Sequence, residues 1–384
     1  MVTSTREIVY GRYRSPICSA QVPFYAVYTG DACLWQYRGD RGATTSTATP
    51  LPPSTVFTDP DTANATYPGD LGTSIALAFQ QTPGPTVIYG IPSTGTDLTS
   101  ALTIASTLNV QFVFLADTPL TATTVAAATA GNPGGVHFQL SSHVTSISKE
   151  DGKERMAVAM LPKDSTDISN IIKNERMVYI AHRSVQDAAA AVAGTIAGYQ
   201  PYVSLLLKPV TIQMPDLFSP ADIINLNNSE DFGQPPQGKG VNWLTSPALL
   251  PGGGIYMGEG YTGNNDLTLG KKFIDIVRTI DDVSFNLKAR LISSIGVLRI
   301  SRSGLRSLVA QMEAVLDPYV RNGILDSYDV VIPLLILLDK DPNTLTPSEI
   351  LQIQNAEAQR LVEVLVAVKY NAQIHRLAIT LTFE

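Results

Sequence analysis

Leu361-Val-Glu-Val-Leu-Val-Ala-Val-Lys-Tyr370 and Leu377-Ala-Ile-Thr-Leu-Thr-Phe-Glu384 are two stretches in which apolar residues occupy every second position. This alternation predicts two half-buried β-strands, and Asn371-Ala-Gln373 predicts a turn between them. Because a two-stranded hairpin is only marginally stable alone, other strands must complete this pair, either from the same chain or from another chain. We expect the apolar face of the last stretch to be buried against a neighbouring subunit. That face consists of Leu377, Ile379, Leu381 and Phe383.

The composition indicates a soluble globular protein with a sizeable core. The chain has 384 residues, of which 44% are hydrophobic and 16% are charged, and this suits two domains or one large domain. The formal net charge of −7 argues against a phosphate-binding surface, so we expect no direct contact with nucleic acid. The longest apolar stretches, 188–197 and 330–338, are shorter than the roughly 20 residues that span a bilayer. Early charged residues argue against a signal peptide, and we expect no membrane insertion.

Residue types that often serve in catalysis, redox reactions or metal binding occur in this sequence without the spacing that those functions require. Cys18 and Cys33 form neither a metal motif nor a redox motif, which leaves two buried thiols or a bridge between them. The histidines show no H-E-x-x-H or other metal spacing, and the sequence contains no G-x-S-x-G elbow and no P-loop. These histidines are His137, His143, His182 and His375. The sequence therefore predicts no catalytic residue, no cofactor and no bound metal.

One glycine motif fits the pattern of a dinucleotide-binding fingerprint. Gly258-Glu-Gly-Tyr-Thr-Gly263 matches G-x-G-x-x-G, and Asp281 and Asp282 follow at about the distance of a ribose contact. A fingerprint needs its last glycine to open a helix, whereas residues 264–270 intervene here, and both aspartates lie in a helical pattern. A glycine-rich turn leaving a sheet is the better interpretation, and a nucleotide site is the alternative.

The helix and strand signals divide the chain into segments. Residues 1–20 are expected to form an N-terminal arm, and residues 21–69 the first part of an inner domain with a Thr/Pro-rich linker. Residues 70–264 alternate between helix and strand signals, which is typical of an α/β layer with a largely parallel sheet. The expected helices are 71–81, 98–108, 166–174 and 185–200, with a further helix capped by Ser219. The expected strands are 86–90, 110–115, 156–161 and 177–181.

Residues 265–360 are expected to form an inner domain, and residues 361–384 the closing strand hairpin. Apolar stripes predict one long helix from about residue 273 to residue 291 and a second over Arg302–Arg321. A strand is expected at 327–338. Thr346-Pro-Ser-Glu349 fits a capping box for a helix that ends near residue 358.

The order and spacing of these elements resemble the sheath proteins of contractile phage tails and related injection machines. The resemblance covers roughly residues 152–384 and is loose before residue 70, and the length matches compact members without large outer decoration domains. It rests on Arg155-Met-Ala-Val-Ala-Met160, the helix Ala188–Gly198, Ile276-Val-Arg-Thr-Ile-Asp281, the helix end Asn322-Gly-Ile-Leu325, and the closing hairpin with Ile374 and Ile379.

The resemblance implies an α/β fold in which an α+β inner domain, built from both chain ends, carries an inserted outward-facing α/β domain. It implies that terminal strands are exchanged between subunits, with Ile8 and Tyr10 in the N-terminal arm and the last stretch at the C-terminus. The implied function is that of a sheath subunit that polymerises as stacked hexameric rings around a tail tube. Contraction then drives the tube through the host envelope for genome or effector delivery.

The implied partners are further copies of the chain, the tail tube protein, and baseplate and tail terminator proteins. The implied location is the virion tail, after assembly in the host cytoplasm. A non-contractile tube or baseplate component stays open as an alternative, because such proteins also assemble by strand exchange. An α/β enzyme also stays open, because a fold alone does not settle function.

A local excess of arginine marks the helix Arg302–Arg321. The arginines are Arg299, Arg302, Arg306 and Arg321. One interpretation is a solvated helix face in which Arg306 or Arg321 pairs with Glu313 and Asp317. The other, which the resemblance implies, is a charged contact with the tube, because many weak exposed ion pairs can hold a surface that must later detach.

Overall fold

The computed structural model describes the backbone of residues 24–30 and residues 54–150, 153–228, 238–250, 253–264, 271–292, 294–373 and 375. The chain divides into two compact units between Val277 and Arg278, within helix α7 (Ile274–Ile292). We call them the N-terminal unit and the C-terminal unit and describe each by itself.

In the described part of the chain, the N-terminal unit is built on a nine-stranded sheet with the order β2-β3-β1-β4-β5-β6-β8-β9-β7. The six strands from β3 to β8 in this order run parallel, and β2, β9 and β7 join the two edges antiparallel. The parallel sheet predicted after residue 70 is therefore present. The strands are β1 (Phe24–Gly30), β2 (Thr55–Phe57), β3 (Ile88–Thr94), β4 (Phe112–Pro119), β5 (Met156–Met160), β6 (Met177–Ala181), β7 (Pro209–Val210), β8 (Asn242–Thr245) and β9 (Ile255–Met257).

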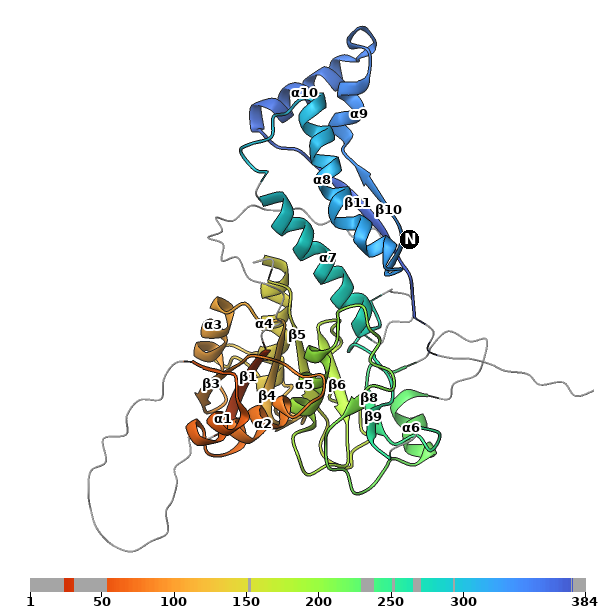
Figure 1. Ribbon diagram of the computed structural model, residues 1–384. Helices are drawn as coiled ribbons and strands as arrows, with labels where there is room; N and C mark the ends of the chain where they lie inside the picture. Colours follow the sequence, from red (N-terminus) through yellow and green to blue (C-terminus); the bar gives the residue numbers. More distant parts are fainter. Residues whose placement is uncertain are drawn as a thin grey trace, which may run out of the picture. The chain divides into compact units, whose positions relative to one another are not determined.

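Helices cover both faces of this sheet (Figure 1). Val158 and Ile180 point into a core shared with one helix group, whereas Ala157 and Tyr179 point into a core shared with the other. Every residue of β5 and β6 is consequently buried, as expected for a parallel sheet between two helical layers. The first group is α1 (Pro60–Thr66), α2 (Asp70–Phe79) and α5 (Ala188–Gly198), and the second is α3 (Thr99–Thr107), α4 (Val136–Glu150) and α6 (Pro220–Asn227).

The alanine-rich helix α5 is buried along its length because small residues let it approach α2 closely. A Cβ atom at Gly194 would lie 2.4 Å from the carbonyl oxygen of Ala78 in α2, so glycine is required there. Asp187 caps the helix, its side chain accepting from Ala190 N at 3.0 Å.

Two features of the N-terminal unit differ from the sequence prediction. Residues 166–174 are not helical, because side chains such as Asp167, which accepts from Ser169 N at 2.8 Å, stabilise local turns instead. Helix α4 was not predicted. Strands β1 and β2 form within residues 21–69, the segment expected to hold the first part of an inner domain and a Thr/Pro-rich linker, and both join the nine-stranded sheet, where β1 lies between β3 and β4.

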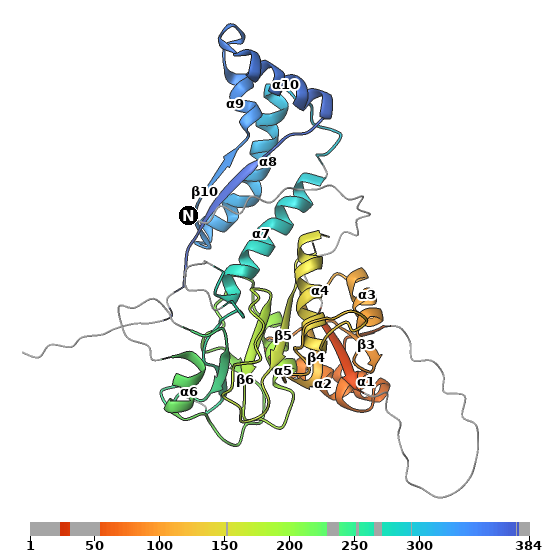
Figure 2. The same cartoon turned by 180° about the vertical axis from the view of Figure 1, so that it is seen from behind.

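The C-terminal unit consists of α7 from Arg278 onward, α8 (Arg302–Arg321), β10 (Leu325–Val331), α9 (Pro333–Asp339), the 3₁₀ turn η1 (Pro342–Thr344), α10 (Pro347–Gln359) and β11 (Leu365–Tyr370) (Figure 2). Strands β10 and β11 pair antiparallel. The bounds predicted for α8 are confirmed, with Ser301 accepting from Gly304 N. The predicted capping box of α10, formed by Thr346 and Glu349, is also confirmed.

One prediction for the C-terminal unit is wrong in part. The strand expected at 327–338 ends at Val331, because Pro333 occupies the first position of a helix and starts α9. The strand predicted within 361–370 is present as β11, and its observed partner is β10. The predicted pairing with residues 377–384 lies outside the described residues.

Candidate assembly surfaces

The two-stranded sheet of the C-terminal unit has one face that is covered over β10 and at Tyr370 of β11, and is open at Val366 and Val368 of β11. The register places Tyr328 opposite Val368 and Val330 opposite Val366, so these four side chains share one face. Tyr328 and Val330 pack beneath α8 in a cluster with Leu316. Val366 and Val368 are exposed. The same face therefore has an apolar strip beside α8 that no described residue covers fully.

The edges of the two sheets differ in length. In the N-terminal unit the edge strand β2 has three residues and the edge strand β7 has two, one of them Pro209. Short edge strands and proline disfavour further pairing. Strands β10 and β11 have seven and six residues, and among the described residues each pairs only with the other. The sheet that can accept added strands is therefore that of the C-terminal unit.

The C-terminal unit also exposes many large apolar side chains. Its buried apolar residues are Val283, Leu305, Met312, Leu316, Ile324, Leu325, Ile332 and Leu334. Its exposed large apolar residues are Phe285, Ile292, Ile295, Val297, Val331, Ile336, Ile350, Leu351, Leu361, Leu365, Val366 and Val368. A unit with more large apolar side chains exposed than buried, within the part that the structure describes, is typical of a protein that associates with others.

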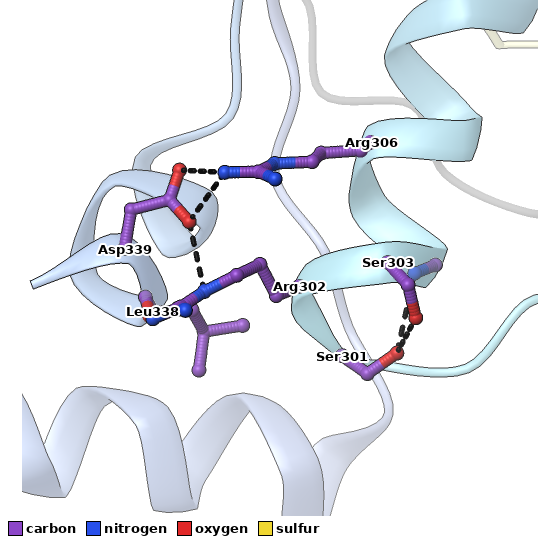
Figure 3. A network of polar contacts seen from close by, with 7 residues as sticks. Ser301, Arg302, Ser303, Arg306, Leu338 and Asp339 are labelled. Carbon is purple, nitrogen blue, oxygen red and sulfur yellow. Dashed lines mark hydrogen bonds and ion pairs between the residues drawn. The ribbon is translucent and has the colours of Figure 1, made fainter.

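Helix α8 and the end of α9 are joined by two arginines and one aspartate (Figure 3). Arg302 Nε lies 2.9 Å from Asp339 Oδ1, and Arg306 Nη2 lies 3.1 Å from the same oxygen. Arg302 also donates to the carbonyl oxygen of Leu338, with its Nε at 3.0 Å and a second contact through Nη2. Leu338 is in the last turn of α9, where carbonyl groups lack helical partners and favour a cation.

The arginines predicted to contact a tube thus have different surroundings. Arg306 pairs with Asp339 on α9, so the intrahelical pairing with Glu313 or Asp317 is not the one observed. Arg299 and Arg321 are exposed and form no ion pair within residues 294–373. The sequence analysis did not identify Asp339 as a partner of these arginines. The signal in the sequence was that Asp339 ends an apolar helix that begins at Pro333.

The residues predicted for strand exchange cannot be placed. Ile8 and Tyr10 in the N-terminal arm lie outside the described residues, as do both cysteines and the face from Leu377 to Phe383.

Of the described histidines in the N-terminal unit, His137 and His182 are buried and His143 is partly buried. His137 Nε2 lies 3.0 Å from the carbonyl oxygen of Thr118, and His182 Nε2 lies 3.0 Å from that of Leu161. Burial lowers the pKa of His137 to about 4 and also lowers the pKa of His182. His143 Nε2 lies 3.2 Å from Arg155 Nη1, and burial followed by the charge of Arg155 lowers its pKa to about 4. All three shifts favour the neutral ring.

The buried carboxylate of Asp187, at the carboxyl edge of the parallel strands, stabilises the fold through hydrogen bonds. Asp187 accepts hydrogen bonds from Ser74 Oγ at 2.7 Å, Asp117 N at 2.8 Å and Ala190 N at 3.0 Å. Its burial raises its pKa. Among the described residues no group of three or more His, Cys, Asp or Glu side chains is arranged to hold a metal ion.

The glycine motif at 258–263 makes room for aromatic rings. A Cβ at Gly258 would lie 2.3 Å from Trp243 Nε1, and one at Gly263 would lie 2.6 Å from the ring of Tyr179. These two glycines are thus explained by packing against side chains, and the interpretation as a glycine-rich turn next to the sheet suits this geometry.

No protein-family model matches the sequence, and no curated protein matches it. The structure, in contrast, is similar to chains of solved contractile particles. A chain in the anti-feeding prophage (AFP) baseplate aligns with a TM-score of 0.60 and 14% identity over 100% of both chains. A chain in the contracted sheath complex of PVC, an extracellular contractile injection system, aligns with a TM-score of 0.61 and 13% identity over 99% of both chains.

The chain has the fold of contractile injection system proteins. A chain of the AFP baseplate in its contracted state supports this, with a TM-score of 0.61 and 13% identity over 98% of both chains. These three alignments cover 98 to 100% of the chain. No described helix is both long and apolar enough to cross a membrane.

Proposed function

We propose that the protein is a structural subunit of a contractile tail sheath. It polymerises helically, as stacked hexameric rings, around a tail tube, and contraction drives the tube through a host envelope. The observation that carries this proposal is the C-terminal unit, which exposes more large apolar side chains than it buries and holds an open-edged sheet. The full-length likeness to a chain of a contracted sheath complex supports it.

In this proposal the C-terminal unit is the tube-facing inner domain and the N-terminal unit faces outward. Terminal strands of neighbouring subunits add to the edges of β10 and β11, since backbone hydrogen bonds between chains can persist while subunits reorient. The apolar strip of Val366 and Val368 then meets side chains of the added strands. The subunit belongs to a virion tail or a related injection particle and has no catalytic role.

A baseplate component is the second candidate. Two of the similar structures are AFP baseplates, one of them in the contracted state. Such a subunit would use the same open-edged sheet, but would form a closed ring instead of a long polymer.

Negative-stain microscopy of the purified full chain, expressed without any tube protein, separates these functions. Long striated tubes are expected for a sheath. The resemblance to contractile sheaths implies a high-energy extended state that forms on the tube, so tubes formed without it should have the contracted lattice. Short rings would favour the baseplate component. Monodisperse particles at all concentrations would contradict both assembly functions.

A further inference from the structure

We propose that Asp339 competes with an acidic partner protein for Arg302 and Arg306. In the free subunit Asp339 pairs with these two arginines, and the partner must displace it to bind them. We call Arg302 and Arg306 the arginine face. The inference rests on the proposed function only for the partner's identity, which in a sheath would be the tube protein. It adds a regulatory contact at that surface.

The charges at this surface do not balance. Two guanidinium groups share the single carboxylate of Asp339, with Arg302 Nε at 2.9 Å and Arg306 Nη2 at 3.1 Å and 3.3 Å from its oxygens (Figure 3). Arg299, three residues before Arg302, is exposed and has no ion pair within residues 294–373. The arginine face therefore keeps surplus positive charge in a chain of net charge −7, and this charge suits a carboxylate-rich protein surface.

The contact with Asp339 can be exchanged. The side chains of Arg302 and Arg306 remain 52% and 64% exposed while bound, and that of Asp339 remains 39% exposed. Ion pairs of such exposure contribute little to stability, so replacing one carboxylate by another costs little. A guanidinium group binds carboxylates through paired N–H donors, and Asp339 engages Arg306 through only one of its two terminal nitrogens.

The position of Asp339 links this exchange to the open-edged sheet. Helix α9 follows β10 directly, and α9, η1 and α10 together connect β10 to β11. When a partner takes the two arginines, Arg302 also withdraws its hydrogen bonds from Leu338 O, and the last turn of α9 loses its cap. Leu334 and Leu338 still pack with Leu305, so α9 remains docked while its end loosens. Partner binding to Arg302 and Arg306 therefore alters the end of α9, which belongs to the segment that connects β10 to β11.

Poly-L-glutamate serves as the probe, and its binding to the full chain is measured by fluorescence anisotropy at low ionic strength. Asp339→Asn should bind about two- to fivefold more tightly than the wild type, equivalent to roughly 0.4 to 1 kcal/mol. Asp326→Asn is the matched control, because Asp326 is an exposed aspartate of the same unit that pairs with Lys369. It makes the same charge change and should tighten binding less. Arg302→Gln with Arg306→Gln should weaken binding and abolish the effect of Asp339→Asn.

Hydrogen exchange provides the second measurement. Saturating poly-L-glutamate should speed amide exchange in the last turn of α9, residues 337–340, and Asp339→Asn should reach the same exchange rate at a lower concentration of the probe. Equal effects of Asp339→Asn and Asp326→Asn, or weaker binding by Asp339→Asn, would overturn the competition. These results do not depend on polymerisation, so striated tubes from a chain that fails this test would leave the sheath function standing.

Discussion

Tyr319 of α8 donates its hydroxyl hydrogen to Asp282 Oδ2 of α7 over 2.5 Å, and this contact fixes the two long helices of the C-terminal unit to each other. Asn286 Nδ2 donates to the same tyrosine oxygen at 2.8 Å. Burial, followed by the hydrogen bond and the charge of Asp282, raises the pKa of Tyr319, so it stays a donor at every physiological pH. A unit with few buried apolar residues depends more on such polar contacts.

Tyr319→Phe should therefore destabilise the C-terminal unit by about 1 to 2 kcal/mol, because a hydrogen bond to a charged acceptor is lost in a half-buried site. The measurement is urea unfolding of the full chain followed by a probe in that unit. Tyr328→Phe is the control, since the hydroxyl of Tyr328 donates to Asp317 in an exposed position and should contribute less. Equal losses from the two variants would contradict the role given to the α7–α8 contact.

A second prediction concerns acid stability of the N-terminal unit. Burial lowers the pKa of His137 from 6.5 to about 4, so the folded state favours the neutral ring. The stabilisation that depends on a neutral His137 ring is complete above pH 6.5 and is lost as the pH falls toward 4. At pH 4.5 the free energy of unfolding should be lower by about 2 kcal/mol for this reason. His137→Gln removes the titration but can still donate to Thr118 O, and should reduce the difference between urea midpoints at pH 7 and pH 4.5. An unchanged difference would show that His137 does not titrate as described.

Asp117 carries a prediction of opposite sign. Partial desolvation of this largely exposed side chain, followed by the negative charges of Asp187 and Asp70, raises the pKa of Asp117 to about 6. The charged form of Asp117 is therefore disfavoured in the folded state. The resulting destabilisation of the folded protein is complete above pH 6 and disappears as the pH falls toward 3.8.

Asp117→Asn should accordingly stabilise the protein at pH 8 by about 1 kcal/mol, a value reduced for the exposure of the side chain, and should have little effect at pH 4. Asparagine tolerates the positive φ of 41° at this position. Asp164→Asn, a like change at another positive-φ residue (64°), should alter stability little at either pH. Unfolding midpoints of both variants at pH 8 and pH 4 make the comparison, and equal effects would contradict the prediction.

Much of the fold could be predicted because local signals agree with tertiary packing. Ser301 before α8, and Thr346 with Glu349 before α10, fix two helix starts through hydrogen bonds within four residues. The alternating β11 pattern and the buried runs of β5 and β6 are likewise visible in the sequence.

The features that the sequence analysis predicted wrongly or missed are a helix start and contacts between residues that are distant in sequence. The apolar run at 327–338 does not show that the strand stops before Pro333. The pairing of Arg306 with Asp339 spans 33 residues, and the acids of its own helix, Glu313 and Asp317, lie outside the i+3 and i+4 positions that face Arg306. In the same way, β11 pairs with β10 across a helical connection that periodicity alone does not reveal.

The last prediction concerns the closing stretch, which lies outside the described residues. Deletion of residues 376–384 should leave a folded, soluble monomer that no longer polymerises, because β10 and β11 pair without it and would lose only the strand that another subunit adds. Circular dichroism, sedimentation and negative-stain microscopy measure fold, size and assembly. Normal tubes from the truncated chain would exclude C-terminal strand exchange.

A matched pair of variants tests which face of that strand is used. Ile379→Asp with Leu381→Asp should block assembly, because both side chains belong to the apolar face that a neighbour is expected to bury. Thr380→Asp with Thr382→Asp adds the same charge to the opposite face and should still allow tubes to form at moderate ionic strength. Since a strand alternates its faces at every residue, equal effects of the two variants would mean that the stretch does not bind as a half-buried strand, whatever the deletion shows.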